Sequence, residues 1–386
     1  MGSVIKVLHL STHDEDCGVG KYQEMFLDTL SDHEGIENKF FDLSPNQIKV
    51  MNDTDLEKTM KQLSQELADY DILHIQHEFS FFYKDEFQRI VDVAQALHKK
   101  IIVTLHASPY VAYKPPKLLG LGPHSMVGYA KAIRLKRKFF KNFVAPMKEV
   151  DMIVVHNQVT KDSMASLGVD RERIVDLVIP VPAIDHAPKS KEIHDALRVK
   201  DKDIVYATVG FLHKFKGIKP AVKALKYLPE NYKLAIIGGV HPQADNEAIY
   251  DEITDLIDKL GLIDRVYITG FVRSDEKMNA LVRECDICVY PYDKTYYSHV
   301  SSASLNNAFA NHVPIVAYPT ESFKEINTHM PALTLTQSCS YYEMAKSLKA
   351  LNIVEAKKQS KDFAQSMSYP KIAPQIISFY EQLLSE

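Results

Sequence analysis

The sequence has only four cysteines among its 386 residues, too few for the disulfide framework that stabilises small secreted proteins. Cys285 and Cys288 have the C-x-x-C spacing of zinc ligands, but no second pair accompanies them. We therefore interpret both as small residues of a buried strand. No apolar run approaches the roughly 20 residues that a membrane-spanning helix needs. Hydrophobic residues at 46% and charged residues at 25% instead indicate an ordinary globular protein.

The N-terminus lacks the pattern of a secretory signal peptide. MGSVIKVLHL passes directly into a strand-like run, without a basic segment followed by a long apolar core. Together with the low cysteine content, this favours the cytoplasm. A peripheral position at the inner membrane surface stays open.

Acidic residues are absent from one long basic segment. Residues 107–148 contain nine Lys or Arg and no Asp or Glu, although the whole chain carries a net charge of −4. Arg134, Lys138 and Lys141 fall on one helical face, with Leu135 and Phe139 on another. A local field of this sign favours a phosphate-bearing partner. Four interpretations stay open: a solvated face of a helix packed on a sheet, an anionic membrane surface, a nucleic acid, or another phosphate-rich polymer.

Short apolar segments alternate with helical segments along the whole chain, which is typical of βαβ units and parallel sheets. Three prolines in VIPVPAIDHAPKS predict a linker near the middle. We therefore expect an α/β protein with two Rossmann-like, doubly wound domains. Ligands bind at the carboxyl ends of the strands in such sheets, so the chemistry is expected there, facing a central cleft.

A glycine-containing loop follows the first predicted strand, within STHDEDCGVGKYQ. Gly18 and Gly20 would let backbone N–H groups approach a ligand at the N-terminus of the next helix. A tight strand-to-helix turn is the competing interpretation. Asp14 and Asp16 form a D-x-D pair, which we interpret as a solvated acidic turn rather than a metal site.

Histidines stand at or just past the ends of three predicted strands. His74 and His77 belong to HIQHEF, His106 to TLHASP and His156 to DMIVVHN. A single histidine at a strand end is more often structural than catalytic. Several polar side chains that converge at one sheet edge nevertheless predict a site.

Two segments of the second half predict a phosphate site. In VGFLHKFKG, the basic side chains of Lys214 and Lys216 lie between a strand and a helix, where they could neutralise a diphosphate. Ser301, Ser302 and Ser304 lie at a predicted helix N-terminus, where backbone N–H groups and hydroxyls could bind phosphate oxygens. A solvated basic turn and an ordinary N-cap are the competing interpretations.

In this order, the segments resemble the retaining glycosyltransferases of family 4, which have the GT-B fold. The resemblance is carried by CGVGKY, DILHIQHEF, IIVTLHA and DMIVVHNQVTKDSM in the first half, and by VGFLHKFKG, DRVYITGFV, CDICVYPY and NNAFANHVPIVAYP in the second. It covers most of the chain. It implies an acceptor-side domain over residues 1–182, a nucleotide-sugar domain over 183–368, and a terminal helix over 369–386 that crosses back to the first domain.

The resemblance also implies site residues. The donor-binding candidates are Gly18, Val19, Gly20, His213, Phe271, Val272, His299, Ser301, Ser302, Ala303, Ser304 and Asn307. The catalytic candidates are His106, Lys214 and Lys216. The acceptor-side candidates come from the residues themselves: His77 and Glu78 at a strand end, and Lys114, Lys117, Arg134, Lys138 and Lys141 in the basic segment.

The sequence departs from the family in one acidic pair. No Asp or Glu occurs over residues 294–320, where the family carries two glutamates eight positions apart. Counting back from Pro314 places His299 and Asn307 at these positions. Asn307 can still accept a hydrogen bond from a ribose hydroxyl, although less strongly than a carboxylate. His299 cannot replace a carboxylate, and one branch of the family uses a serine-rich run here, which SSAS resembles.

The resemblance implies a hexosyltransferase that takes its sugar from a nucleoside diphosphate sugar, with retention and without an obligatory metal or cofactor. A UDP-sugar is the favoured donor and a GDP-sugar the alternative. The basic segment favours a phosphate-rich acceptor: an anionic lipid, a nucleic acid or a cell-surface polymer. Two other functions are weighed against transfer: a catalytically silent sugar-nucleotide binding protein, and a GT-B epimerase of nucleotide sugars. The oligomeric state stays open.

Overall fold

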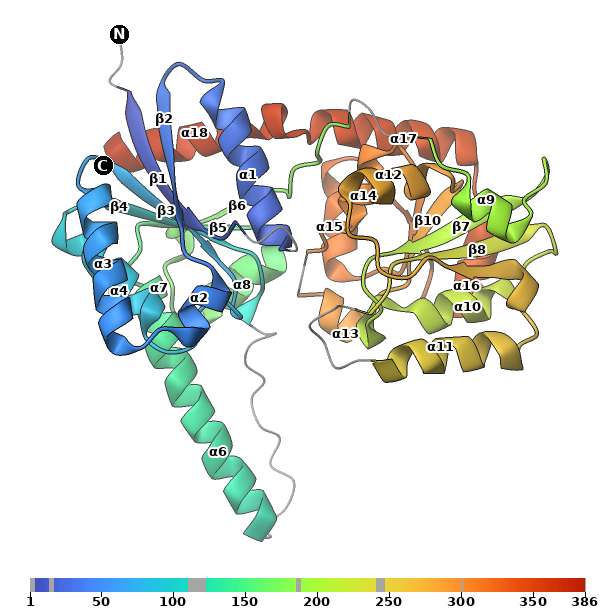
Figure 1. Ribbon diagram of the computed structural model, residues 1–386, viewed down its shortest axis with the longest axis horizontal. Coiled ribbons are helices and arrows are strands. Elements are labelled where there is room, and N and C mark those ends of the chain that lie inside the picture. Colours follow the sequence, from blue (N-terminus) through green and yellow to red (C-terminus); the bar gives the residue numbers. More distant parts are fainter. Residues whose placement is uncertain are drawn as a thin grey trace. The chain divides into compact units, whose positions relative to one another are not determined.

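The computed structural model describes residues 4–13, 17–109, 123–184, 189–240, 247–299 and 301–385, and it divides the chain into two compact units (Figure 1). The first unit comprises Met1–Val178, His299–Ser301 and Ile372–Glu386; the second comprises Ile179–Ser298 and Ser302–Lys371. The division after Val178 falls slightly before the expected boundary at residue 182. The chain returns to the first unit at Ile372, slightly after the expected residue 369.

The first unit is built on a six-stranded parallel sheet with the order β2-β1-β3-β4-β5-β6. Its strands are β1 Ile5–Ser11, β2 Ile36–Asp42, β3 Ile72–His77, β4 Lys100–Leu105, β5 Met152–Val155 and β6 Ile174–Asp176. β2 and β6 are not expected from the sequence. β2 is a half-exposed edge strand with charged side chains, and β6 has only three residues, so neither shows the apolar run of a central strand.

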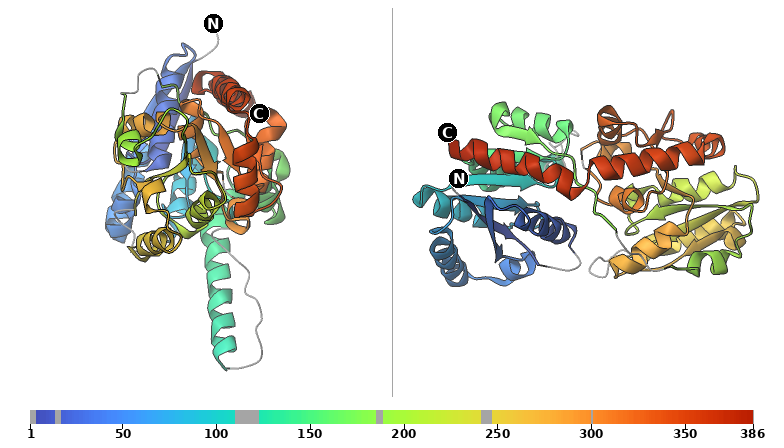
Figure 2. Two further views of the ribbon diagram at one scale, coloured as in Figure 1. Left: turned by 90° about the vertical axis from the view of Figure 1, so that its right-hand side faces the viewer. Right: turned by 90° about the horizontal axis from the view of Figure 1, so that it is seen from above.

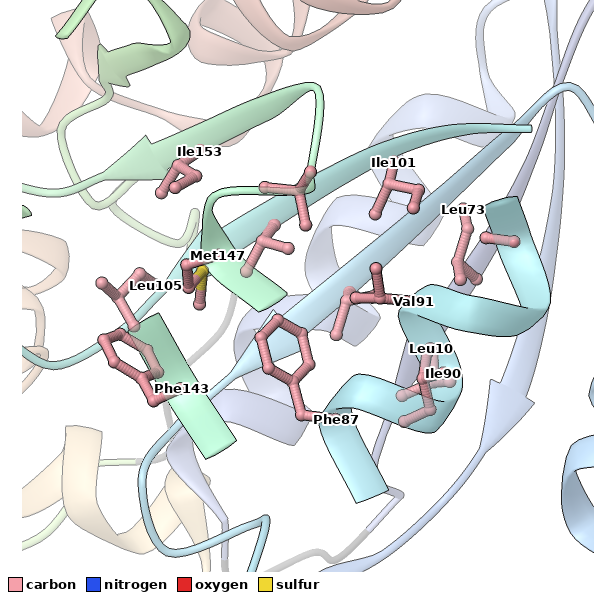
Figure 3. Packing of buried hydrophobic residues seen from close by; sticks show 14 of the residues in the cluster. Leu10, Leu73, Phe87, Ile90, Val91, Ile101, Leu105, Phe143, Met147 and Ile153 are labelled. Atoms are coloured by element: carbon pink, nitrogen blue, oxygen red, sulfur yellow. The ribbon is translucent and has the colours of Figure 1, made fainter. Parts of the chain in front are cut away.

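One face of this sheet is apolar. Its side chains pack against α2 (Pro45–Val50), α3 (Asp53–Leu67), α4 (Glu86–Ala96), η1 (Phe140–Val144) and α7 (Ala145–Met147). Figure 3 shows Phe87, Ile90 and Val91 of α4 among the residues of this core. The remaining helical segments of the unit are α1 Gly18–Ser31, α6 Pro123–Phe139, α8 Gln158–Ser166, η2 Arg171–Arg173 and α18 Tyr369–Ser385.

The second unit has its own six-stranded parallel sheet, ordered β12-β11-β10-β7-β8-β9. Its strands are β7 Ile204–Val209, β8 Tyr232–Ile237, β9 Val266–Ile268, β10 Ile287–Tyr290, β11 Ile315–Ala317 and β12 Thr334–Leu335. Its helical segments are α9 Glu192–Leu197, η3 Lys214–Lys216, α10 Ile218–Leu225, α11 Glu247–Lys259, η4 Ile263–Arg265, α12 Asp275–Arg283, α13 Lys294–Tyr297, α14 Leu305–Ala310, α15 Glu321–His329, α16 Tyr341–Ala350 and α17 Ile353–Ser366. The expected architecture of two doubly wound parallel sheets is thus confirmed.

Both strand orders contain a switch point, where the chain leaves two neighbouring strands in opposite directions. In the first sheet it lies between β1 and β3, and in the second between β7 and β10. The loops at the carboxyl ends of such a strand pair diverge and leave space for a ligand. These two positions are therefore where binding residues are expected.

Cys285 and Cys288 are buried in the second unit, at 6% and 0% exposure, as expected for core residues. Burial raises the pKa of the Cys288 thiol to about 12, which keeps it protonated. Among the described residues, no three His, Cys, Asp or Glu side chains are arranged to hold a metal ion. In the same part of the chain, no helix is long and apolar enough to cross a membrane.

Gly217 joins η3 to α10 in a backbone conformation that only glycine adopts easily. Its φ is +68°, and a Cβ placed there would lie 1.8 Å from the carbonyl oxygen of Pro291. We expect Gly217→Ala to lower the free energy of unfolding by about 3 kcal/mol or more, because left-handed strain and overpacking add. Urea denaturation measures this loss.

Gly261 supplies the matched control for this substitution. Its φ of +65° is nearly the same, but a Cβ there would meet no heavy atom within 4 Å. Gly261→Ala should therefore cost only the backbone strain, about 1 kcal/mol. Equal losses in the two variants would contradict the close approach of Gly217 to Pro291.

Candidate functional site

The second unit gathers a lysine, two tyrosines and two serines at its switch point. Lys216 lies in η3, after β7, and Tyr292 follows β10, the neighbouring strand. Lys216 Nζ donates to Tyr292 Oη at 2.8 Å and to Ser304 Oγ at 3.1 Å. It also lies 4.7 Å above the ring centroid of Tyr292 and 5.5 Å from that of Tyr297. These contacts hold the ammonium at the carboxyl end of the sheet.

The charge of Lys216 is maintained despite its surroundings. Burial lowers the pKa of the ammonium, but the neighbouring Tyr292 and Tyr297 raise it, and the net direction is upward. The side chain is therefore a cation at neutral pH. A half-buried cation whose hydrogen-bond partners among the described residues are hydroxyls is suited to bind an anion, such as a diphosphate.

The serines next to Lys216 form a small hydroxyl cluster. Ser302 Oγ lies 2.9 Å from Ser304 Oγ, and Tyr292 Oη lies 2.6 Å from Ser304 Oγ and 3.3 Å from Ser302 Oγ. α14 begins only at Leu305, and the side chain of its N-cap residue, Ser304, makes no capping hydrogen bond. The Ser304 hydroxyl is thus committed to Lys216 and Tyr292 rather than to the helix. Ala303, between the serines, adds no bulk.

His213 and Lys214 precede Lys216 but differ in role. His213 caps η3 by accepting from the backbone N–H of Phe215 at 3.4 Å. Partial burial and the two nearby lysines lower the pKa of its imidazole, so the ring is neutral at neutral pH. His213 therefore supplies no positive charge beside Lys216 at neutral pH. Lys214 is exposed, with its Nζ 4.9 Å from the Phe215 ring centroid. It is a second lysine in η3, two residues before Lys216.

Two aromatic rings flank the end of β8. Phe211 and Phe271 stack at a centroid distance of 5.8 Å and an interplanar angle of 13°, and Phe211 is 38% exposed. A Cβ at Gly239 would lie 2.4 Å from the backbone nitrogen of Phe271, so only glycine permits this close approach. Phe271 and Val272 are half-buried in the loop after β9.

The residues at the positions of the family's glutamates lie in different units. Asn307 is on α14, and its side chain is half-buried. Its backbone carbonyl oxygen accepts a hydrogen bond from Asn311 Nδ2 at 2.7 Å. His299 and Ser301 belong to the first unit. There Ser301 Oγ accepts from Asn157 Nδ2 at 2.8 Å and donates to the carbonyl oxygen of His156 at 3.2 Å.

The glycine loop of the first unit lies at the other switch point. α1 begins at Gly18 directly after the loop that follows β1, and its first turn carries no acidic side chain. A Cβ at Gly18 would meet no heavy atom of the described residues within 4 Å. Val19 is half-buried and Gly20 is buried. Asp14 and Asp16 lie outside the described residues.

A row of histidines lines the second face of the first sheet. His74 Nδ1 lies 2.7 Å from Tyr380 Oη of α18, and its Nε2 lies 2.8 Å from Thr104 Oγ1. His106 Nε2 lies 2.8 Å from Gln76 Oε1, and its Nδ1 lies 3.2 Å from His156 Nε2. Both ring nitrogens of His106 are therefore engaged within the unit. Burial lowers its pKa well below the usual range, as the neighbouring His156 also does, so the ring is neutral.

His77 does not lie with the other strand-end histidines. It is 2% exposed, on the apolar face of the sheet, with Phe82, Phe87 and Phe143 at centroid distances of 5.1, 4.8 and 5.1 Å. Its expected place on the acceptor side was wrong, because alternate strand residues face opposite sides of a sheet. Glu78 is turned back onto its own loop, where it accepts hydrogen bonds from the backbone N–H and hydroxyl of Ser80.

The basic acceptor-side candidates that the structure describes come together. Arg134 and Lys138 of α6 and Lys141 of η1 are exposed and line one surface depression with Lys131 and Arg137. Lys114 and Lys117 lie outside the described residues.

Sequence reasoning missed Tyr292, Tyr297 and Phe211. Each stands in a segment that the sequence already marks, but a tyrosine or phenylalanine after a strand is an ordinary core residue. Only the neighbouring positions of β7 and β10 in the sheet reveal that Tyr292 contacts a lysine 76 residues away.

Comparisons with known proteins concern the family and the fold. Residues 189–366 match the model of the family Glycosyl transferases group 1. No curated protein matches the chain by sequence.

Solved structures resemble the chain over nearly its full length. HepE (Alr3699) of Anabaena is 15% identical with a TM-score of 0.66, over 98% of this chain and 100% of HepE. Sucrose-phosphate synthase of Thermosynechococcus elongatus is 16% identical with a TM-score of 0.69, over 99% of each chain. A glycosyltransferase of Rickettsia africae is 12% identical with a TM-score of 0.67, over 98% of each chain. The expected GT-B fold and the resemblance to glycosyltransferases are confirmed.

Proposed function

We propose that the chain moves a hexosyl group from a UDP-sugar to an acceptor hydroxyl, with retention and without an obligatory metal, since residues 189–366 match the model of the glycosyl transferases group 1 family. The observation that carries this proposal is the Lys216 ammonium, held by Tyr292 and Ser304 at the switch point of the second sheet. A diphosphate leaving group gains negative charge as the sugar departs. A preorganised cation and hydroxyl donors at that point stabilise the transition state.

A structural neighbour supports the choice of donor. HepE of Anabaena has been solved with UDP, with UDP and glucose, and with UDP-glucose, and it has the same fold as this chain. This likeness favours a UDP-sugar over a GDP-sugar. The nucleotide base would contact the loop after β9, which carries Phe271 and Val272. The ring of Phe271 stacks on that of Phe211 there.

Donor-phosphate contacts are proposed for each unit by itself. In the second unit, Lys216 and Lys214 would neutralise the diphosphate, and the hydroxyls and amides over Ser302–Ser304 would donate to its oxygens. In the first unit, the predicted donor contacts are Ser301 and the N–H groups at Gly18, Val19 and Gly20, at the positive end of α1. Asn307 would accept from a ribose hydroxyl, and His299 would take a glutamate's position without its charge.

The reaction needs no carboxylate from the protein. The bond between the sugar's anomeric carbon and the phosphate oxygen breaks, and the acceptor oxygen bonds to that carbon on the same face. The acceptor's proton passes to the released diphosphate. His106 would lie near the sugar or the acceptor hydroxyl, and would have to exchange its contact with Gln76 or His156 to bind either one. The exposed bases Arg134, Lys138 and Lys141 favour a phosphate-rich acceptor.

Release of the nucleoside diphosphate tests the function directly. We expect UDP to be released from a UDP-hexose, slowly without acceptor and faster with one, and release of GDP from a GDP-hexose to be much slower. Tight donor binding without any release would support the silent binding protein. An altered sugar that stays attached to UDP would support the epimerase. Either result would overturn the proposal.

A further inference from the structure

α6 of the first unit is an exposed helical arm. At its C-terminal end it is anchored by Phe139 and Phe143, whose rings pack on Phe79 at centroid distances of 6.2 and 4.6 Å. From Tyr129 to Lys138, every residue is exposed except Ala132, which is half-buried. Figures 1 and 2 show no other helix or strand of the described first unit alongside the part of α6 toward Pro123.

The side chains divide this arm into two halves. At 100° per residue, one half carries Arg134, Lys138 and Lys141, with Lys131 and Arg137 at its borders. The opposite half carries Tyr129, Ile133 and Phe140, the first residue of η1, which are 45%, 37% and 36% exposed. Leu135, 53% exposed, lies at the edge of this half and also lines the depression that the bases form. Lys136 is the one base in the apolar half, and its Nζ lies over the Phe140 ring at 5.6 Å.

This division excludes the simpler explanations of the basic charge. A helix packed on its own sheet would bury its apolar half, whereas these four side chains are exposed. A nucleic acid would need only the basic half and would leave the apolar half in water. Two copies facing through their apolar halves would bring two strongly basic arms together, with no acidic side chain over residues 107–148 to compensate them.

An anionic membrane surface can bind the basic half and the apolar half of the arm at the same time. Apolar and aromatic side chains enter the boundary between headgroups and acyl chains, while Lys and Arg on the other half stay near the anionic headgroups. Lys136 can extend its ammonium from the apolar half to the headgroups because its stem is long.

We propose that α6 docks the protein on an anionic phospholipid membrane, with Tyr129, Ile133, Leu135 and Phe140 facing the lipid. The helix then lies in the interface and does not cross it. This role goes beyond the transfer reaction and does not depend on the identity of the donor.

Vesicle flotation with the full-length chain tests the proposal. We expect binding to vesicles of phosphatidylglycerol and phosphatidylcholine, and at least tenfold weaker binding to phosphatidylcholine alone. Raising the salt from about 50 to about 500 mM should also weaken binding several-fold, because screening shortens the reach of the charges. The double variant Ile133→Glu/Leu135→Glu should weaken binding to the anionic vesicles at least tenfold.

Val354→Glu is the matched control, since Val354 of α17 is 82% exposed and lies outside α6. It should bind vesicles like the wild type. An unchanged thermal melting temperature of the double variant verifies its fold. Equal vesicle binding by wild type and double variant would overturn the proposal, as would wild-type binding to a nucleic acid but not to vesicles. A dimer that the double variant abolishes, without vesicle binding by the wild type, would show instead that a second copy covers the arm.

Discussion

Lys216→Met is expected to lower kcat/KM for transfer from a UDP-hexose about 100- to 1,000-fold while the chain stays folded. Methionine keeps most of the side chain's length but removes the cation. The loss is large because the ammonium is already desolvated and held by Tyr292 and Ser304, so it needs no reorganisation as the diphosphate departs. UDP release under limiting donor measures the effect.

Lys219→Met is the matched control. Lys219 lies three residues further on, is 43% exposed, and pairs with Glu252 on α11. Its removal should leave the rate within about twofold of the wild type. Similar rates for Lys216→Met and Lys219→Met would mean that the charge at the switch point takes no part in the reaction.

Tyr292→Phe separates the hydrogen bonds of Tyr292 from its ring. The substitution keeps the aromatic face beneath Lys216 but removes the hydroxyl that contacts Lys216 and Ser304. We expect about a tenfold loss of kcat/KM, smaller than for Lys216→Met, since the cation is displaced but not lost.

Stability should fall steeply as the pH drops below 6.5, because the first unit buries several neutral histidines. Burial lowers the pKa of His9 and of His156 to about 4, and that of His77 to about 3. The unfolded chain binds protons at these side chains below pH 6.5, whereas the folded chain does not until near pH 4. Protonation therefore favours unfolding throughout this window, and stability rises with pH.

The expected loss is large. Each pH unit below 6.5 costs about 1.4 kcal/mol per histidine, so each of these three costs about 2 kcal/mol at pH 5 relative to pH 7. Urea denaturation at several pH values measures the slope. His77→Leu should reduce the slope by one proton, since the leucine would fill the same aromatic pocket without titrating. A stability that does not vary between pH 7 and 5 would contradict neutral burial.

The sequence predicts the central strands well because these strands are apolar runs between turn residues. The apolar runs VIKVLHL (4–10), DILHIQ (71–76) and IIVTLH (101–106) lie within one residue of the limits of β1, β3 and β4. The edge strand β2 could not be found in this way, since water covers one side of it and IENKFFD keeps its polar side chains. The alternation of polar and apolar residues can be recognised within one segment. Whether a strand lies at the edge of a sheet depends on the order of all its strands.

The candidate site is predictable only in part. Lys216 could be proposed because it follows a strand and precedes a helix, whereas its partner Tyr292 depends on which strands become neighbours. His77 was misplaced although the signal was present: in ILHIQH it shares the parity of Leu73 and Ile75, which face the apolar core. His74 and Gln76 have the opposite parity and join the polar network. The amphipathic pattern of α6 was visible, but its exposure was not.

Calorimetric titration of UDP into the intact chain tests most directly whether the second unit holds a nucleotide diphosphate through Lys216. UDP should bind the wild type and Lys219→Met with the same Kd, and Lys216→Met should raise that Kd at least tenfold. Binding of UDP to Lys216→Met with wild-type affinity, or no binding of any nucleoside diphosphate to the wild type, would contradict this account.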